Sequence, residues 1–273
     1  MNAARRLCGI GTVLISALVW TGAANAGPRV ASLDQCADQY VLALAPRADV
    51  AALSFRSDDA DSYLRAAAAG LPRRRASLES VLASRPGVVV RYWGGDELMT
   101  RRLAGRGIAV VKIEDAQAFT GVRANIARVA AALGRPAAGA ALIARMDARL
   151  AAAHGAWAGR RALYLTPGGY TAGQGTLVGA MLSAAGLRSA APAPGFAPVS
   201  LERLVVDPPQ AFVLGFFDEA SAGTSHWSIA GHHALQRAMA GRRLASLPGA
   251  ILGCPAWFAA DGAQALADAR GRP

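Results

Sequence analysis

One short pattern occurs twice in the chain, and its copies begin 123 residues apart, at Ser77 and Ser200. Each copy starts with Ser-Leu-Glu, has a proline nine residues after the serine, and ends in an apolar run. The serine oxygen can cap a helix, and the proline bars that helix from continuing. The apolar run is typical of a strand that is covered on both faces. Each copy therefore predicts a short capped helix followed by a core strand.

The wide spacing of the two copies constrains the architecture. Solenoid repeats usually recur about every 20–50 residues, so this repeat is not a solenoid unit. It predicts two similar α/β lobes instead. Strand candidates at Val50–Ser54, Ala109–Ile113 and Arg161–Leu165 alternate with helix patterns in both halves, which favours mainly parallel sheets with right-handed crossovers. The segment 34–39 is expected to be a polar turn, and the segment 167–175 a glycine-rich loop. Two lobes leave a cleft between them, and a cleft is where a small molecule would bind.

The N-terminus has the pattern of a secretory signal. Arg5 and Arg6 precede an apolar stretch from Leu7 to Trp20, and Ala24-Asn25-Ala26 is a small-x-small cleavage site. An uncleaved anchor helix is the alternative, although the apolar stretch is short for about 30 Å of hydrocarbon. We expect an exported protein whose mature chain begins at Gly27.

The middle of the chain lacks strand candidates. Val122, Ile126 and Val129 recur at helical spacing, and a second helical pattern follows the break at Gly134-Arg135-Pro136. A long helical connector between the lobes is the natural interpretation. The predicted division is a signal peptide at 1–26, an N-terminal α/β lobe at 27–118, a helical connector at 119–160 and a C-terminal α/β lobe at 161–273.

The distribution of charge limits the kinds of partner that are expected. The formal net charge is +11, and Lys112 is the only lysine. The arginines are scattered and no nucleic-acid motif occurs, so a nucleic-acid partner is not expected.

Cys36 and Cys254 remain in the mature chain. In an oxidising compartment they can pair or stay free, and sequence alone does not place their Cα atoms.

Taken together, the chain resembles the periplasmic substrate-binding proteins of ABC importers, in the class that carries vitamin B12, ferric siderophores or haem. The resemblance rests on residues 29–45, the first repeat with Tyr92-Trp93-Gly94-Gly95, residues 167–186, and Cys254-Pro255-Ala256-Trp257. It implies two Rossmann-like lobes joined by a single long backbone α-helix, with ligand in the cleft. It also implies a periplasmic location. We further expect a monomer without a cofactor.

The resemblance also implies an inner-membrane ABC permease as partner. Glu79 and Glu202 match the positions at which one glutamate on each lobe docks into arginine pockets of the permease. Both glutamates lie in the first turn of a predicted helix, where a carboxylate favours the positive helix end. Helix capping is therefore the alternative role for each of them.

Candidate ligand contacts lie in loops that follow strands. Tyr92 and Trp93 directly follow a strand, and planar rings there give wide apolar contact at low entropy cost. Tyr170, Trp227 and Trp257 are further candidates, with core packing as the alternative for each aromatic residue. The arginine candidates are Arg56, Arg73 and Arg75. They can receive carboxylates, catecholates or phosphates, or they form a solvated surface. Arginines at the cleft would favour an anionic iron chelate over cobalamin.

These observations predict a protein that captures a metal chelate, cobalamin or a ferric siderophore, and delivers it to a permease without chemistry. A haem-binding member of the same class is the alternative, with ligation by Tyr170 or a histidine left open. His226, His232 and His233 fit no helical ligand pair, so no metal site is predicted.

Two other functions are less consistent with the sequence. An exported hydrolase would use Ser183, Ser200 or Ser225, but the chain contains neither G-x-S-x-G nor H-E-x-x-H. A sensor with the same two-lobed fold is the remaining alternative.

Overall fold

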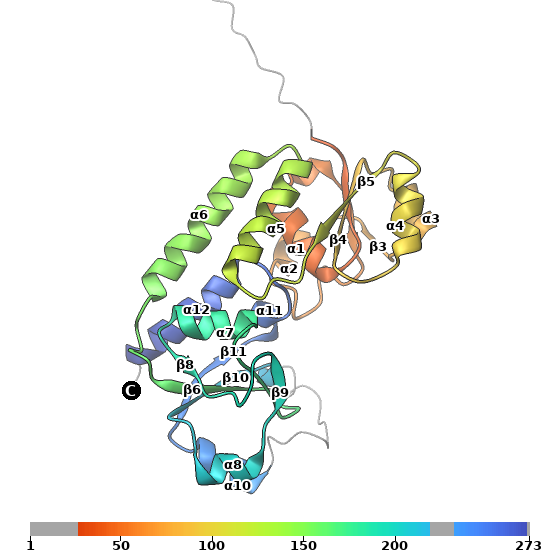
Figure 1. Cartoon of the computed structure of the whole chain (residues 1–273). Helices are drawn as coiled ribbons and strands as arrows, with labels where there is room; N and C mark the ends of the chain where they lie inside the picture. Colours follow the sequence, from red (N-terminus) through yellow and green to blue (C-terminus); the bar gives the residue numbers. More distant parts are fainter. Residues whose placement is uncertain (1–26, 219–231, 272–273) are drawn as a thin grey trace, which may run out of the picture.

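Two parallel sheets organise the chain, one in each lobe (Figure 1). The structure is a computed structural model and describes residues 27–218 and 232–271. The predicted signal peptide, Ser225, His226 and Trp227 lie outside these residues. Within the part of the chain that is described, no helix combines the length and the apolar character that crossing a membrane requires.

The first lobe is built round a five-stranded parallel sheet in the order β3-β2-β1-β4-β5. Its strands are β1 (Val30–Ser32), β2 (Val50–Ser54), β3 (Arg73–Arg74), β4 (Val88–Tyr92) and β5 (Ala109–Ile113). Its helices are α1 (Gln35–Leu44), η1 (Arg47–Asp49), α2 (Arg65–Ala68), α3 (Leu78–Ala83) and α4 (Glu97–Ala104). The strand order reverses between β1 and β4. Their carboxyl ends therefore form the crevice in which such sheets bind ligands.

The second lobe is built round a four-stranded parallel sheet in the order β11-β10-β6-β8, with an antiparallel pair β7-β9 beside it. Its strands are β6 (Arg161–Leu165), β7 (Tyr170–Ala172), β8 (Arg188–Ser189), β9 (Phe196–Pro198), β10 (Ala211–Gly215) and β11 (Arg243–Leu247). Its helices are α7 (Leu177–Ala184), α8 (Leu201–Val206), α10 (His233–Met239), α11 (Gly249–Leu252), α12 (Ala259–Asp268) and η3 (Ala269–Gly271). Strand β7 lies inside the segment for which the sequence indicated only a glycine-rich loop.

The two copies of the repeat fold as predicted. The Oγ atom of Ser77 accepts a hydrogen bond from the Ser80 amide at the start of α3, and Ser200 caps α8 through the Arg203 amide, both over 3.2 Å. Strands β4 and β10 follow these helices, and both lie inside their sheets. The predicted fold class, with two Rossmann-like lobes, is thus confirmed.

The segment between the lobes consists of two helices, α5 (Phe119–Ala132) and α6 (Pro136–Ala153), that pack against each other (Figure 1). The break comes at Gly134, whose φ of 67° favours glycine, and Pro136 starts the next helix. Helix α5 packs on β5 and α1 of the first lobe, whereas α6 packs on α12 and α7 of the second. Helix α6 is therefore the single long helix that links the lobes.

The C-terminal segment returns from the second lobe to the first. The Tyr40 hydroxyl on α1 donates to the carbonyl oxygen of Pro255 over 2.6 Å. The ring of Trp257 packs edge-on against Tyr40 at 5.5 Å, and Tyr63 stacks on Phe258 at 4.3 Å. One continuous hydrophobic cluster includes buried residues of both sheets and of this segment. The lobes consequently share a core instead of meeting through a loose linker.

Candidate ligand-binding cleft

A cavity of about 500 Å³ is lined by residues of both lobes. The first lobe contributes Tyr92, Trp93 and the segment from Asp115 to Gln117, and the second contributes Gly175–Val178, Met181, Gly195 and Phe196. The segment from Leu252 to Pro255 completes the lining. We call this cavity the cleft. Its place after β4, at the reversal of strand order, is the one that parallel sheets use for ligands.

Tyr92 is held on the first wall by two hydrogen bonds. Its backbone amide donates to Oδ2 of Asp34, which follows β1, and its hydroxyl donates to Oδ1 of Asp115, which follows β5, each over 2.7 Å. Burial, and then the bond to Asp115, raises the pKa of the Tyr92 phenol, so the phenol stays protonated at neutral pH. Tyr92 is thus a fixed, neutral part of the wall.

Trp93 is the exposed part of the same wall. Its side chain is 52% exposed, and its ring meets that of Tyr92 edge-on with centroids 6.1 Å apart. The two glycines that follow both have positive φ, 79° at Gly94 and 77° at Gly95, and the chain turns sharply away after the tryptophan. A large apolar ring left half in water at a cavity edge is a surface that a bulky ligand can cover.

The second wall is formed by the start of α7 and by β9. The Oγ1 atom of Thr176 accepts from the Gly179 amide over 2.9 Å and donates to the carbonyl of Gly173 over 2.7 Å, which caps α7. A Cβ atom on Gly179 would lie 2.3 Å from the Gly173 oxygen, so the close approach requires glycine. Phe196 on β9 is 71% exposed and lines the cleft.

The structure brings some predicted contacts to the cleft and places others elsewhere. Tyr92 and Trp93 line it. Tyr170 is exposed at the first residue of β7, opposite Pro198, and is not among the lining residues. Trp257 packs on Tyr40 and lines a separate cavity of about 250 Å³ beside α6. Trp227 lies outside the described residues.

Phe196 was missed in the sequence. Its only local signal is an aromatic residue next to Gly195 in an alanine- and proline-rich stretch, much as Trp93 is next to Gly94 in the first lobe. Its role depends on the pairing of β9 with β7, because this pairing brings Phe196 opposite Ala172.

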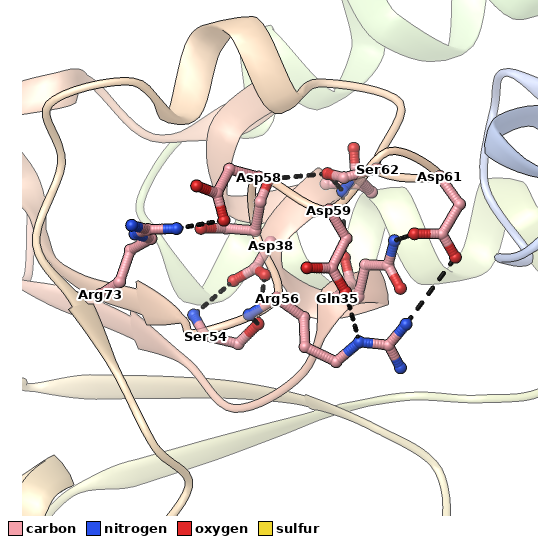
Figure 2. A network of polar contacts seen from close by, with 11 residues as sticks. Gln35, Asp38, Ser54, Arg56, Asp58, Asp59, Asp61, Ser62 and Arg73 are labelled. Carbon is pink, nitrogen blue, oxygen red and sulfur yellow. Dashed lines mark hydrogen bonds and ion pairs between the residues drawn. The ribbon is translucent and has the colours of Figure 1, made fainter.

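The predicted arginine contacts already have partners. Arg56 donates from Nε to Oδ2 of Asp59 over 2.7 Å and lies 3.8 Å from Oδ2 of Asp61 (Figure 2). Arg73 forms an ion pair with Asp58. Neither arginine is among the residues that line the cleft. The aspartates that follow β2 thus neutralise the two arginines that were predicted to pair with an anionic ligand.

Arg75, the third predicted arginine contact, lies over the ring of Phe55 at 5.2 Å from its centroid. It follows β3, the edge strand of the first sheet, and is likewise not among the lining residues. Strands β3 and β4 are three positions apart in the sheet, which corresponds to roughly 14 Å at ~4.8 Å per strand.

A buried polar cluster supports the loop that carries these aspartates. Asp38 on α1 is fully buried and accepts from the amide and the hydroxyl of Ser54, over 2.8 and 2.6 Å (Figure 2). It also accepts from the Ser32 hydroxyl. Burial raises the pKa of Asp38 to about 6. Gln39 donates to Ser62 over 2.9 Å. The expectation of a polar turn over 34–39 was wrong, since helix α1 begins at Gln35 behind the Asp34 cap.

The two predicted docking glutamates are exposed on equivalent helices. Glu79 lies in the first turn of α3 and Glu202 in that of α8, at the outer ends of the two lobes (Figure 1). The Ser200 hydroxyl donates to Oε2 of Glu202 over 2.7 Å, which lowers the pKa of this carboxyl. Both side chains are available to a partner.

Three solved structures share the fold over most of this chain. A periplasmic heme-binding protein from Pseudomonas aeruginosa is 24% identical with a TM-score of 0.62, over 89% of this chain and 92% of that one. An Fe3+-hydroxamate transport protein from Saccharomonospora viridis is 21% identical with a TM-score of 0.66, over 90% and 94%. The vitamin B12 binding protein BtuF of Vibrio cholerae is 17% identical with a TM-score of 0.59, over 90% and 97%.

No curated protein matches the chain. The family model described as periplasmic binding protein matches residues 30–243, which include the first sheet, helix α6, the second sheet up to the first residue of β11, and most of the cleft. The chain therefore belongs to the periplasmic binding protein family.

Proposed function

We propose that this protein captures a bulky metal chelate in the periplasm and delivers it to an ABC permease. The observation that carries the proposal is the cleft, in which exposed aromatic rings of both lobes, Trp93 and Phe196, line one cavity. A cavity of about 500 Å³ is in the usual range for small-molecule sites. The similar solved structures are named for haem, ferric hydroxamate and vitamin B12, which are all bulky metal chelates.

The mechanism requires no covalent step, in keeping with a family of binding proteins. Planar rings such as Trp93 cover the faces of the chelate, while Tyr92 and Thr176 stay in place through their own hydrogen bonds. The shared core limits how far the lobes can separate. Occupancy is then signalled to the permease by a small change in lobe orientation.

Calorimetric titration of the mature protein with cyanocobalamin, ferrioxamine B and haemin tests the proposal. We expect saturable binding of at least one chelate. Trp93→Ala should weaken this binding by about tenfold or more, because burial of a large apolar side chain contributes roughly 1.5–3 kcal/mol and the variant loses it. Trp157→Phe is the matched control, since Trp157 lies outside the cleft and donates to the Leu266 carbonyl. Binding that neither Trp93→Ala nor Phe196→Ala weakens would place the ligand elsewhere.

Glu79 and Glu202 are proposed as the permease contacts. Their matched positions on α3 and α8, and their exposure, support this role besides capping. The double variant E79Q/E202Q keeps both side-chain shapes and should leave chelate affinity unchanged while it abolishes stimulation of the reconstituted permease ATPase. Asp147→Asn on α6 is the control and should retain stimulation. Full stimulation by the double variant would exclude the docking role.

We further propose that the chain is exported, cleaved after Ala26 and active as a monomer. The pattern of Arg5, Arg6 and the apolar stretch supports export. Mass spectrometry of the periplasmic protein should find Gly27 at the N-terminus, and light scattering should give the mass of one mature chain. An intact leader or a stable dimer would contradict these two points.

A further inference from the structure

We infer that the cleft selects a chelate without net negative charge, either neutral or cationic. The inference rests on the proposed function, because it names the charge class of ligand for the same cleft. Among the described residues that line the cleft, Asp115 is the only charged one, and the others are aromatic, aliphatic or uncharged polar. A cavity that is lined in this way offers a carboxylate to a bound ligand, but no ammonium or guanidinium group.

The cations nearest the cleft along the chain are paired. Arg91 immediately precedes Tyr92, but its side chain is only 5% exposed; it donates to Thr100 over 2.6 Å and lies 3.5 Å from Glu97. A Cβ atom on Gly95 would lie 2.7 Å from this guanidinium, so the turn covers it. Lys112 on β5 lies 3.6 Å from Glu114. The Nη2 atom of Arg91 is buried beneath the turn at Gly95 without a hydrogen-bond partner, so an anionic ligand would have to displace this turn to reach it, or break the pair of Lys112 with Glu114.

The arginines of the β2 and β3 loops do not change this balance. Arg56 and Arg73 are paired with aspartates, and Arg75 lies at the far edge of the first sheet. The net charge of +11 is thus carried by other parts of the molecule.

The start of α7 is the one feature of the lining that favours an anion. A helix N-terminus carries roughly half a positive charge, and its effect falls off within the first turn. Thr176 already accepts from the Gly179 amide there. Asp115 carries a full negative charge and already uses one oxygen to hold Tyr92, so its other oxygen remains for a cationic or hydrogen-bond-donating group of the ligand.

The test compares four probes of different charge by calorimetric titration of the mature protein. Ferrioxamine B is a cationic ferric chelate, cyanocobalamin is neutral, haemin carries carboxylates, and ferric enterobactin is strongly anionic. We expect ferrioxamine B or cyanocobalamin to bind at least about tenfold more tightly than ferric enterobactin and haemin, as close like charges oppose binding.

Asp115→Asn keeps an acceptor for the Tyr92 hydroxyl and removes the charge. It should reduce the ratio of affinities between ferrioxamine B and ferric enterobactin by about tenfold, whereas Asp147→Asn on α6 should leave the ratio unchanged. The inference would be overturned if an anionic probe bound more tightly, or if Asp115→Asn left the ratio of the two affinities unchanged. Either result would leave the proposed function standing. Failure of all four probes to bind would overturn the proposed function itself.

Discussion

A disulfide joins Cys36 at the start of α1 to Cys254 between α11 and α12, although 218 residues separate them in the chain. Their Cα atoms are 5.3 Å apart, and Cys254 lies in the lining of the cleft. The bond therefore ties the first lobe to the C-terminal segment next to the cleft. The sequence left open whether these cysteines pair, and the structure resolves this in favour of the bond.

Loss of this disulfide should destabilise the protein. A cross-link that closes so long a loop restricts the unfolded chain strongly, so we expect Cys36→Ser/Cys254→Ser to lower the free energy of unfolding by about 3–5 kcal/mol. Urea unfolding without reductant measures the difference, and wild-type protein treated with a phosphine reductant should behave like the variant. Equal stability of the oxidised wild type and the double variant would contradict the prediction.

Asp261 on α12 should be a second tie between the lobes. Its carboxylate accepts from the Tyr63 hydroxyl of the first lobe and forms an ion pair with Arg149 on α6, and the side chain is only 15% exposed. Asp261→Ala leaves both donors without their acceptor and should cost about 1–3 kcal/mol in urea unfolding. Asp268→Ala on the same helix, where the exposed Asp268 carboxylate accepts a hydrogen bond from Gln264, should cost less than about 0.5 kcal/mol.

The elements that the sequence predicted well share one property, which is a local signal. Strands Val50–Ser54, Ala109–Ile113 and Arg161–Leu165 are short apolar runs between breakers, and the structure has the same bounds. The repeat predicted its caps because a serine and its target amide are three residues apart. Alternating elements were enough to predict two parallel lobes and a linking helix.

The features that the sequence did not predict depend on distant partners. Asp38 looked like part of a polar turn, because nothing near it in the chain shows that Ser54 will satisfy its buried carboxylate. Trp93 and Trp257 follow similar apolar runs, yet one lines the cleft and the other packs on Tyr40. Arg73 likewise gave no sign that Asp58, in the loop after β2, would neutralise it. The partner of Arg56 is a local exception, because Asp59 lies only three residues further along the chain.

Asp38 should make the protein less stable as the pH rises from about 4 to 6. Burial raises its pKa from an ordinary 3.8 to about 6, so the folded state holds this proton more tightly than the unfolded state. The stabilisation is complete below pH ~4, is lost between the two pKa values, and amounts to roughly 3 kcal/mol. Burial also raises the pKa of neighbouring Asp34, which acts in the same direction.

The contribution of Asp38 can be isolated with Asp38→Asn, which keeps the shape of the side chain and cannot ionise. Urea unfolding of both proteins at several pH values gives the difference in stability. We expect this difference to change by a few kcal/mol between pH 4 and pH 7 in favour of the variant at the higher pH. A pH-independent difference would mean that Asp38 has no raised pKa in the folded protein.

Neutralising the arginines of the first lobe should leave ligand affinity almost unchanged. Arg56 and Arg73 are exposed, and their charges are balanced by Asp59, Asp61 and Asp58, so Arg56→Gln and Arg73→Gln remove no cation from the cleft. Calorimetry with the best-bound chelate should give affinities within about twofold of wild type, as isolated exposed charges contribute little. In contrast, Trp93→Ala should show its tenfold loss in the same series. A large loss in either arginine variant would mean that these loops rearrange on binding and bring a guanidinium to the ligand.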